Sequence, residues 1–259
     1  MTIRPVAPPG APCWVDLWTS DVEGSRHFYS ELFGWQAGEP SSDYGGYFMF
    51  TRAGIPVAGA MGEMGETPAD NTWKPYFASD DIERTLQLAA EHGATLRQPA
   101  VAIGDLGQQA VITDPAGAVT GIWQPDSFPG FTVIHEHATP SFVAINVRDY
   151  HTEIAFYRRV FAWDPLEEEN DGHHYAGYMD LVSDRPIAGV GDEDESLAPE
   201  ESPQWTIFWQ CDDVGTSVAK LRALGGTVVA EPTDGGLGRI AHVADPSGAR
   251  FCLFSPKVK

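Results

Sequence analysis

The two halves of the sequence are similar to each other, and this internal repeat constrains the fold more than any other feature. When the second half is aligned with the first at an offset of 128 positions, a series of apolar and turn-forming residues coincides. The coincident residues are Pro12, Val15, Asp21, Phe28, Tyr29, Phe33 and Trp35 with Pro140, Val143, Asp149, Phe156, Tyr157, Phe161 and Trp163. A repeat of this length predicts two similar domains in one chain.

The repeat continues through four further blocks that keep their order along the chain. They are 56–59 with 186–189, Trp73 with Trp205, 80–82 with 212–214, and 114–117 with 245–248. Between the halves, residues 125–139 contain two prolines and little periodicity, which is typical of a linker. We therefore expect domains over 1–124 and 140–259, joined by a linker over 125–139.

Composition excludes several classes of function. The 259 residues are 42% hydrophobic, enough to build folded cores, and carry a formal net charge of -21. A chain this acidic lacks the basic surface that nucleic acid or anionic membranes require. Much of the acidity falls in two runs, 167–169 and 192–195, which we interpret as solvated loops.

Cysteine usage and hydropathy indicate a cytoplasmic protein. Cys13, Cys211 and Cys252 are odd in number and do not have the spacing of a disulfide framework or a zinc site, which favours a reducing compartment. Residues 1–12 contain no apolar run typical of a signal peptide. We also expect no membrane span, because no stretch of 18 apolar residues occurs.

Each half divides again into two strand–helix–strand–strand units. The first unit has predicted strands at 14–19, 45–52 and 55–60 and a helix at 25–33, with Asp21 at its N-cap. The second has strands at 73–79, 110–113 and 118–124 and a helix at 81–91. The last two strands are joined by Asp114-Pro115-Ala116-Gly117, in which proline sets φ and glycine permits positive φ. Residues 140–256 repeat this plan.

This organisation resembles the vicinal oxygen chelate superfamily, the group of glyoxalases, bleomycin-resistance proteins and extradiol dioxygenases. The resemblance is carried by 20–23, Phe28-Tyr29, 32–35 and 114–123, and by their counterparts in the second half. The chain is most similar to two-domain actinobacterial glyoxalase-like proteins. The resemblance implies an α+β fold with four βαβββ modules, paired into two domains with curled mixed sheets. It is specific for fold and uninformative about activity.

The resemblance also implies where a metal would bind. Family members place a His or Gln seven residues before the helix-capping Asp, and a Glu seven residues after the Asp of the Asp-Pro turn. In this chain those positions hold Trp14, Lys74 and Gly121 in the first half and Phe142, Thr206 and Cys252 in the second. None supplies the expected ligand, so we expect no metal and no other cofactor. The cluster His135-Glu136-His137 has metal-like composition, but a solvated linker is the better interpretation.

Strand alternation assigns residues to the faces of the sheets. Two sets should point into the two clefts. The first is Trp14, Asp16, Trp18, Tyr47, Met49, Lys74, Tyr76, Gly121 and Trp123, and the second is Phe142, Ala144, Asn146, Tyr178, Asp180, Thr206, Phe208, Gln210, His242, Arg250, Cys252 and Phe254. The aromatic surface suits a flat, largely apolar ligand.

Few polar groups face the clefts, and they differ between the copies. Asp16 between two tryptophans is a candidate general acid or base, and a hydrogen-bonded structural carboxylate is the alternative. His242 is the second candidate for proton transfer. The alternative is that His242 is a structural strand residue whose hydrogen bonds are satisfied. Asp180 is a candidate partner of His242 or Arg250, and Arg250 could hold an anionic group. Cys252 is better explained as a small buried hydrophobe than as a nucleophile.

Three functions remain open. The first is an enzyme that acts without a metal on an aromatic or carbonyl-containing metabolite, by isomerase-, lyase- or cyclase-type proton transfer. The second is a binding protein that sequesters an aromatic natural product, and the third is a metal-dependent glyoxalase or dioxygenase. The partner is in each case a small molecule. The chain should be a monomer whose two domains mimic a dimer, or a homodimer.

Overall fold

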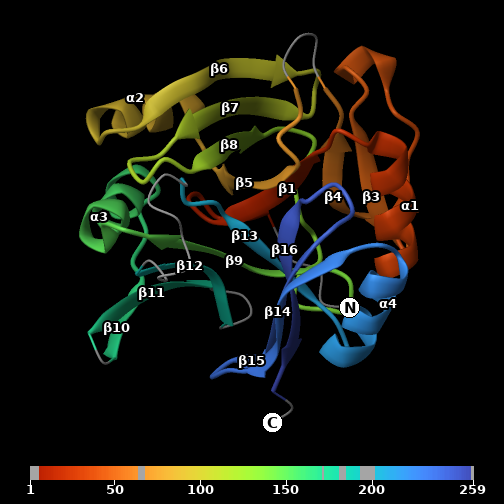
Figure 1. Ribbon diagram of the computed structural model, residues 1–259. Helices are drawn as coiled ribbons and strands as arrows, with labels where there is room; N and C mark the ends of the chain where they lie inside the picture. Colours follow the sequence, from red (N-terminus) through yellow and green to blue (C-terminus); the bar gives the residue numbers. More distant parts are fainter. Residues whose placement is uncertain (1–5, 64–67, 171, 181–184, 193–201, 258–259) are drawn as a thin grey trace.

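The chain folds into two mixed eight-stranded sheets with two long helices each (Figure 1). The computed structural model describes residues 6–63, 68–170, 172–180, 185–192 and 202–257. Within these ranges the predicted α+β class and the division into two glyoxalase-like halves are confirmed. The expected curled mixed sheets are also present, with strand order interrupted by crossovers in both.

The first sheet has the order β2-β3-β4-β1-β5-β8-β7-β6. Its strands are β1 (Pro12–Trp18), β2 (Gln36–Ala37), β3 (Phe48–Arg52), β4 (Ile55–Met61), β5 (Thr72–Ala78), β6 (Thr95–Ile103), β7 (Gly107–Thr113) and β8 (Val119–Pro125), with helices α1 (Val22–Phe33) and α2 (Ile82–Glu91). Strand β1 pairs parallel with β4 and antiparallel with β5, so the two βαβββ units join at the centre of the sheet.

The second sheet repeats this order strand for strand, as β10-β11-β12-β9-β13-β16-β15-β14. Its elements are β9 (Pro140–Val147), α3 (Tyr150–Val160), β10 (Leu166–Asn170), β11 (His173–Asp180), β12 (Arg185–Asp192), β13 (Thr206–Gln210), α4 (Val214–Ala223), β14 (Thr227–Asp234), β15 (Gly238–Ala244) and β16 (Arg250–Pro256). The internal repeat of the sequence is therefore an internal repeat of topology.

Each repeated aspartate before a helix is an N-cap. The side chains of Asp21, Asp81, Asp149 and Asp213 accept hydrogen bonds from backbone N–H groups in the first turns of α1, α2, α3 and α4. Such caps satisfy N–H groups that the helix itself leaves unpaired. Four independent caps explain why aspartate recurs at this point of every module.

The two halves are joined by a crossed pair of tyrosine–aspartate hydrogen bonds. Tyr29 on α1 donates from its hydroxyl to Asp245 at 2.9 Å, and Tyr157 on α3 donates to Asp114 at 3.0 Å. Both aspartates belong to Asp-Pro turns, and in each the other carboxylate oxygen accepts a backbone N–H within the turn. The repeated tyrosine of one half therefore contacts the repeated turn of the other.

Aromatic side chains from both halves pack around this crossed pair. Trp35 donates to the carbonyl of Ala138, and its counterpart Trp163 donates to the carbonyl of Gly10. The rings of Trp35 and Trp209 lie 4.9 Å apart, although they belong to different halves. The buried apolar residues of the two halves form one continuous cluster. The two halves therefore pack against each other through one continuous apolar core.

The symmetry of the interface is broken by Glu153 on α3, whose counterpart in the first half is Ser25. Glu153 is 1% exposed and accepts from the backbone N–H of Ala116 at 3.0 Å. Burial, followed by the adjacent Asp114 carboxyl, raises the pKa of Glu153 to about 9. The two carboxyl groups therefore retain a proton between them at neutral pH.

Three sequence-based interpretations need correction. The run 167–169 is not a loop, because it lies in the fully exposed edge strand β10. Strand β6 was implied by the βαβββ module but was not located in the sequence, since Pro99 and a mostly exposed side-chain pattern hide its periodicity. The segment 126–139 has no helix or strand, but it is not a solvated linker, since Phe131, Val133, Ile134 and Ala138 are buried.

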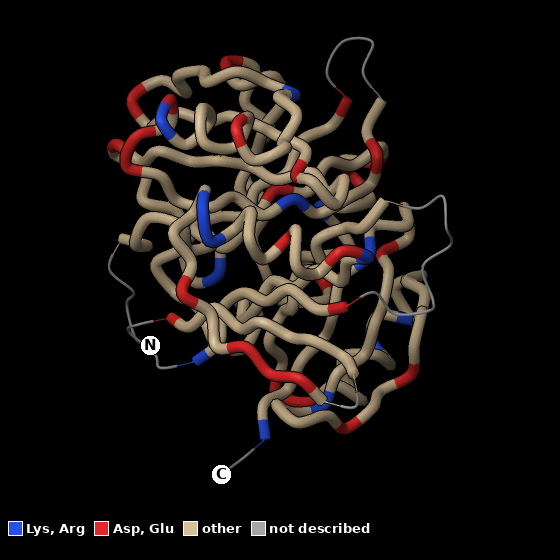
Figure 2. The backbone as a smooth tube through the Cα atoms, turned by 90° about the vertical axis from the view of Figure 1, so that its left-hand side faces the viewer, with Lys and Arg blue, Asp and Glu red and all other residues tan. Residues whose placement is uncertain are grey.

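Charge is spread over the whole molecule. Acidic positions are distributed over both halves rather than gathered on one face (Figure 2). Of the second acidic run, residues 193–195 lie outside the described ranges. No helix in the described part of the chain is both long and apolar enough to cross a membrane.

The first testable prediction concerns Glu153. Its pKa is raised from 4.5 to about 9 on folding, so the folded state holds a proton that the unfolded state releases. The associated stability is fully present below about pH 4.5 and is lost as the pH rises toward 9. Glu153→Gln should therefore flatten the decline in the free energy of unfolding between these values, as measured by urea denaturation.

The matched control is Glu83→Gln, which removes an exposed carboxylate from α2. It should keep the pH dependence of the unaltered protein. An undiminished decline of stability in the Glu153→Gln variant would show that Glu153 does not carry the buried proton.

Candidate functional site

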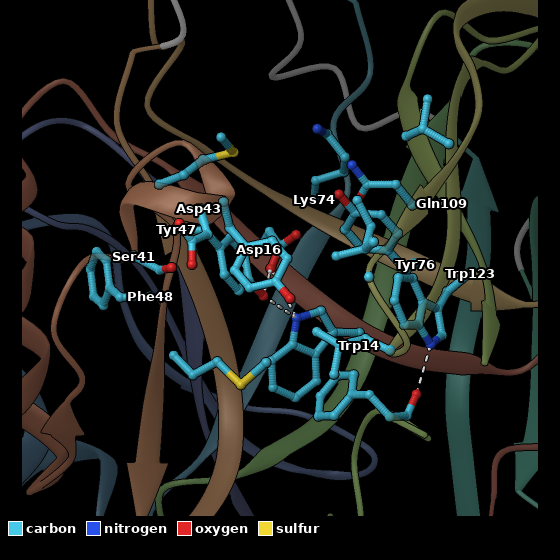
Figure 3. Close-up of a pocket in the computed structure, with 18 of the residues that line it drawn as sticks. Trp14, Asp16, Ser41, Asp43, Tyr47, Phe48, Lys74, Tyr76, Gln109 and Trp123 are labelled. Atoms are coloured by element: carbon cyan, nitrogen blue, oxygen red, sulfur yellow. Dashed lines mark hydrogen bonds between the residues drawn. The ribbon is translucent and has the colours of Figure 1, made fainter. Parts of the chain in front are cut away.

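A cavity of about 630 Å³ is lined by residues of the first sheet and its loops (Figure 3). Eight of the residues assigned to this cleft by strand alternation line it, namely Trp14, Asp16, Trp18, Tyr47, Met49, Lys74, Tyr76 and Trp123. Sequence reasoning missed the wall supplied by β6, with Gln98 and Val101, and the contribution of Phe128. Gln98 and Val101 were missed because β6 itself was not located in the sequence. Phe128 was missed because it follows β8 in a segment without periodicity.

Asp16 lies at the centre of the polar part of the cavity, between Tyr47 and Tyr76 (Figure 3). Its Oδ1 atom accepts from the Trp14 indole N–H at 2.9 Å and from the Tyr47 hydroxyl at 2.9 Å. The same indole nitrogen lies 3.0 Å from the Tyr47 oxygen. The carboxyl group is thus held in one orientation by groups from β1 and from the residue before β3.

Burial raises the pKa of Asp16, and the hydrogen bond from Tyr47 and the charge of Lys74 only partly oppose this shift. Burial also raises the pKa values of Tyr47 and Tyr76 well above the usual range of a phenol. Both tyrosines therefore stay protonated and act as donors. The site combines one carboxyl group that is poised to exchange a proton with two fixed hydroxyl donors.

Two glycines create the space for these groups. A Cβ atom on Gly59 would lie 1.9 Å from the Tyr47 hydroxyl and 2.2 Å from Asp16 Oδ1. A Cβ atom on Gly121 would lie 2.3 Å from the ring of Tyr76. Any larger residue at either position would displace a polar group of the site. Glycine at 121, where metal-using relatives carry a Glu, is therefore required by the position of Tyr76.

The second cleft has the same framework, but a phenylalanine ring lies beside its glycine. Gly189 is the counterpart of Gly59, and a Cβ atom there would lie 2.3 Å from the Tyr175 hydroxyl and 2.8 Å from the ring of Phe142. Phe142 also packs edge-on against Phe208, with ring centroids 5.4 Å apart. Where the first cleft holds a carboxyl group, the second holds the end of a phenylalanine ring.

His242 and Asp16 do not belong to one site. His242 is an exposed residue of β15 in the second sheet, and its Nδ1 atom lies 3.3 Å from the Cys252 sulfur. Sequence reasoning saw no such pair, because the two residues meet only through the register of β15 and β16. Burial raises the pKa of the Cys252 thiol far above its usual range, so the group stays a thiol.

The remaining second-cleft residues are dispersed. Tyr178 does not face the cleft as predicted, because its ring stacks on the core residue Trp163 at 5.0 Å. A register shift in β11 follows Tyr178, and the buried Asp180 beyond it lies in register with Arg185. Asn146 and Arg250 are exposed. The structure thus brings the predicted residues of the first cleft together in one cavity, and in the second half it brings together Phe142 with Phe208 and His242 with Cys252.

The residues at the family's metal-ligand positions in the first half do not fit a metal, and the second half has Phe142, Thr206 and Cys252 at these positions. Trp14 uses its indole N–H to bind Asp16, Lys74 presents an ammonium group, and Gly121 has no side chain. The alternative histidines contact other groups, His135 with Ser141, His137 with Asp212 and His242 with Cys252. Among the described residues no group of three or more His, Cys, Asp or Glu side chains is arranged to hold a metal ion.

Comparison with known proteins identifies the family. The model of the glyoxalase/bleomycin resistance protein/dioxygenase superfamily matches residues 13–121 and 139–253. The chain therefore belongs to this superfamily, and the resemblance noted in the sequence is confirmed.

Two relatives match nearly the whole chain. The "Putative glyoxylase CFP32" of Mycobacterium tuberculosis (strain CDC 1551 / Oshkosh) is 33% identical over 253 residues, covering 95% of both chains. The anthracycline biosynthesis protein DauV of Streptomyces sp. (strain C5) is 30% identical over 262 residues, covering 95% of this chain and 93% of its own.

Solved structures show the same fold at low identity. The Mn(II)-bound glyoxalase from Novosphingobium aromaticivorans is 12% identical with a TM-score of 0.67, covering 95% of this chain and 82% of its own. The 2,3-dioxygenase LapB from Pseudomonas sp. KL28 is 14% identical with a TM-score of 0.67, covering 98% and 94%. At such identities the likeness establishes the fold alone.

The residues at the metal-ligand positions predict that the protein binds no metal ion. Elemental analysis of the purified, untagged protein should find far less than one metal ion per chain. Added Mn²⁺, Zn²⁺, Fe²⁺ or Ni²⁺ should not raise the melting temperature, because an ion that bound only the folded state would stabilise it. A stoichiometric metal that is lost with a chelator, together with a thermal shift on its return, would contradict this prediction.

Proposed function

We propose that the first cleft binds a flat aromatic, carbonyl-bearing metabolite and that Asp16 exchanges a proton with it without a metal. The observation that carries the proposal is the single buried carboxyl group, fixed by Trp14 and Tyr47 within an aromatic cavity of about 630 Å³. Such a cavity has the size and lining expected of a small-molecule site.

The chemistry of the walls favours an aromatic ligand. Trp14, Trp18, Tyr76 and Trp123 offer rings on which a planar molecule can stack. The similarity to a protein of anthracycline biosynthesis supports the same class, since anthracyclines are fused aromatic ring systems with carbonyl groups. The proposal therefore names a polycyclic aromatic ketone or quinone as the kind of ligand.

Proton transfer by Asp16 fits its surroundings. With its pKa raised by burial, the carboxyl group is a stronger base when ionised than an exposed aspartate, and it also holds a proton at higher pH. It would remove a proton from carbon next to a ligand carbonyl and return it at another atom. The hydroxyl groups of Tyr47 and Tyr76 would donate hydrogen bonds to the oxygen that gains charge.

A second candidate function is binding alone. It is favoured by the two hydrogen bonds that Asp16 Oδ1 already accepts, because a carboxylate so engaged is a weaker base. In this case the ligand would be sequestered and recovered unchanged. The two functions differ in whether Asp16 moves a proton of the bound molecule.

The substitution that tests catalysis is Asp16→Asn, which keeps the shape of the side chain and removes its titration. We use daunorubicin, an anthracycline with an exchangeable acetyl group, as the probe. In deuterated buffer the unaltered protein should accelerate incorporation of deuterium at that group. The variant should lose about 100-fold or more of this rate and bind the probe with an affinity within about fivefold, as measured by quenching of its fluorescence.

The control is Asp80→Asn, at an exposed position outside the cavity, which should keep the exchange rate. Binding of daunorubicin without accelerated exchange would favour sequestration for this ligand class. No binding of daunorubicin by the unaltered protein would contradict the proposed ligand class.

The difference between the clefts predicts stoichiometry. Because Phe142 and Tyr175 occupy the second cleft where Asp16 and Tyr47 stand in the first, calorimetric titration should give one ligand per chain. Gly59→Leu, which places a side chain in the first cleft, should abolish that binding. Two equivalent sites, or binding that survives this substitution, would place ligand in the second half.

A further inference from the structure

The cavity contains one basic side chain among its lining residues, and this is Lys74. Lys74 lies on β5, seven residues before the helix-capping Asp81. It therefore stands at one of the positions from which metal-using members of the family supply a ligand. The remaining charged lining residues, Asp16, Glu39 and Asp43, are acidic.

The surroundings of Lys74 leave its ammonium donors available. The Nζ atom lies 5.2 Å from the centre of the Trp18 ring, a cation–π contact that orients the chain without using an N–H donor on an oxygen. No carboxylate in the described part of the chain lies within ion-pair distance of Nζ. Asp16 and Lys74 are in register on neighbouring strands and are coupled only through space.

Lys74 and Gln109 both line the cavity, and in the view of Figure 3 they lie to the right of Ser41 and Asp43. Gln109 offers an amide that can donate or accept a hydrogen bond, and Lys74 supplies the positive charge. A ligand oxygen that carries negative charge is therefore favoured beside Lys74 and disfavoured beside Asp43.

We propose that Lys74 binds an acidic oxygen of the ligand as its anion, and so supplies in this cleft the positive charge that a metal ion supplies in metal-using relatives. The inference rests on the proposed function and narrows its ligand to aromatic ketones or quinones that carry an acidic phenolic or enolic hydroxyl. On binding, the O–H bond of the ligand breaks, the electron pair stays on oxygen, and the proton passes to solvent.

Physical chemistry supports this pairing. Burial lowers the pKa of Lys74, and the charges of Asp16 and Asp70 only partly oppose this shift. An oxyanion at hydrogen-bond distance would oppose it further, and the enclosed site would strengthen the attraction relative to water. An ammonium group also needs only one ligand oxygen, in contrast to a chelated metal.

A purely structural alternative assigns Lys74 to balancing the charge of Asp16. That role requires no ligand and would leave the ionisation of a bound molecule unaffected. The two roles are separated by a probe that reports its own protonation state. Alizarin, a dihydroxyanthraquinone, changes its visible absorption when its phenol ionises, and anthraquinone has the same ring system without an acidic oxygen.

The experiment compares the unaltered protein with Lys74→Met and Lys74→Arg. Alizarin is titrated with each protein, at a pH where free alizarin is mostly neutral. The unaltered protein should shift its absorption to that of the anion, and Lys74→Arg should keep most of this shift. Lys74→Met should abolish the shift and weaken alizarin binding about tenfold or more, while anthraquinone binding changes less than about twofold.

The matched control is Lys220→Met on the exposed face of α4, which should behave as the unaltered protein. Melting temperatures establish that each variant is folded. Binding of alizarin with the same anionic spectrum in Lys74→Met would overturn the inference and leave the cleft as an aromatic site. Binding of anthraquinone but not alizarin would overturn it as well. Failure of both dyes to bind would instead contradict the proposed function.

Discussion

The crossed hydrogen bonds between Tyr29 and Asp245 and between Tyr157 and Asp114 are the interactions on which the rest of the structure depends. Each buries a polar pair inside an aromatic core, where an unpaired hydroxyl or carboxylate would be costly. Since each tyrosine finds its acceptor only in the other half, the halves are held in one relative position. The surfaces left free by this arrangement are the inner faces of the two sheets, where the clefts lie.

The two clefts share one backbone framework and differ in a few side chains, which make the first cleft the candidate site. Both retain the glycine that brings neighbouring side chains close to the strand, at Gly59 and Gly189. In the first cleft, that space holds the Asp16 carboxyl group and the Tyr47 hydroxyl. In the second cleft, it holds the Phe142 ring and the Tyr175 hydroxyl. The backbone is shared, and the chemistry is set by side chains at equivalent places.

Sequence predicted the parts of this structure that depend on local patterns. Two-residue alternation placed Trp14, Asp16 and Tyr76 on the inner face, and the repeated aspartates marked the helix starts. It did not locate β6, whose periodicity is broken by Pro99, and misplaced Tyr178, where a register shift changes the local pattern. The contact of His242 with Cys252 and the space beneath Tyr76 depend on strand register and on glycine, which the pattern of apolar residues does not encode.

The pseudo-twofold arrangement in one chain has an evolutionary consequence. In a dimer of identical subunits, every substitution appears in both clefts, so a change that improves one must be tolerated in the other. Fusion removes that coupling. One half can acquire a charged group such as Asp16 while the other keeps Ala144 and devotes its interior to packing. The free-energy cost of burying a carboxyl group in a cleft then arises in one cleft and not in both.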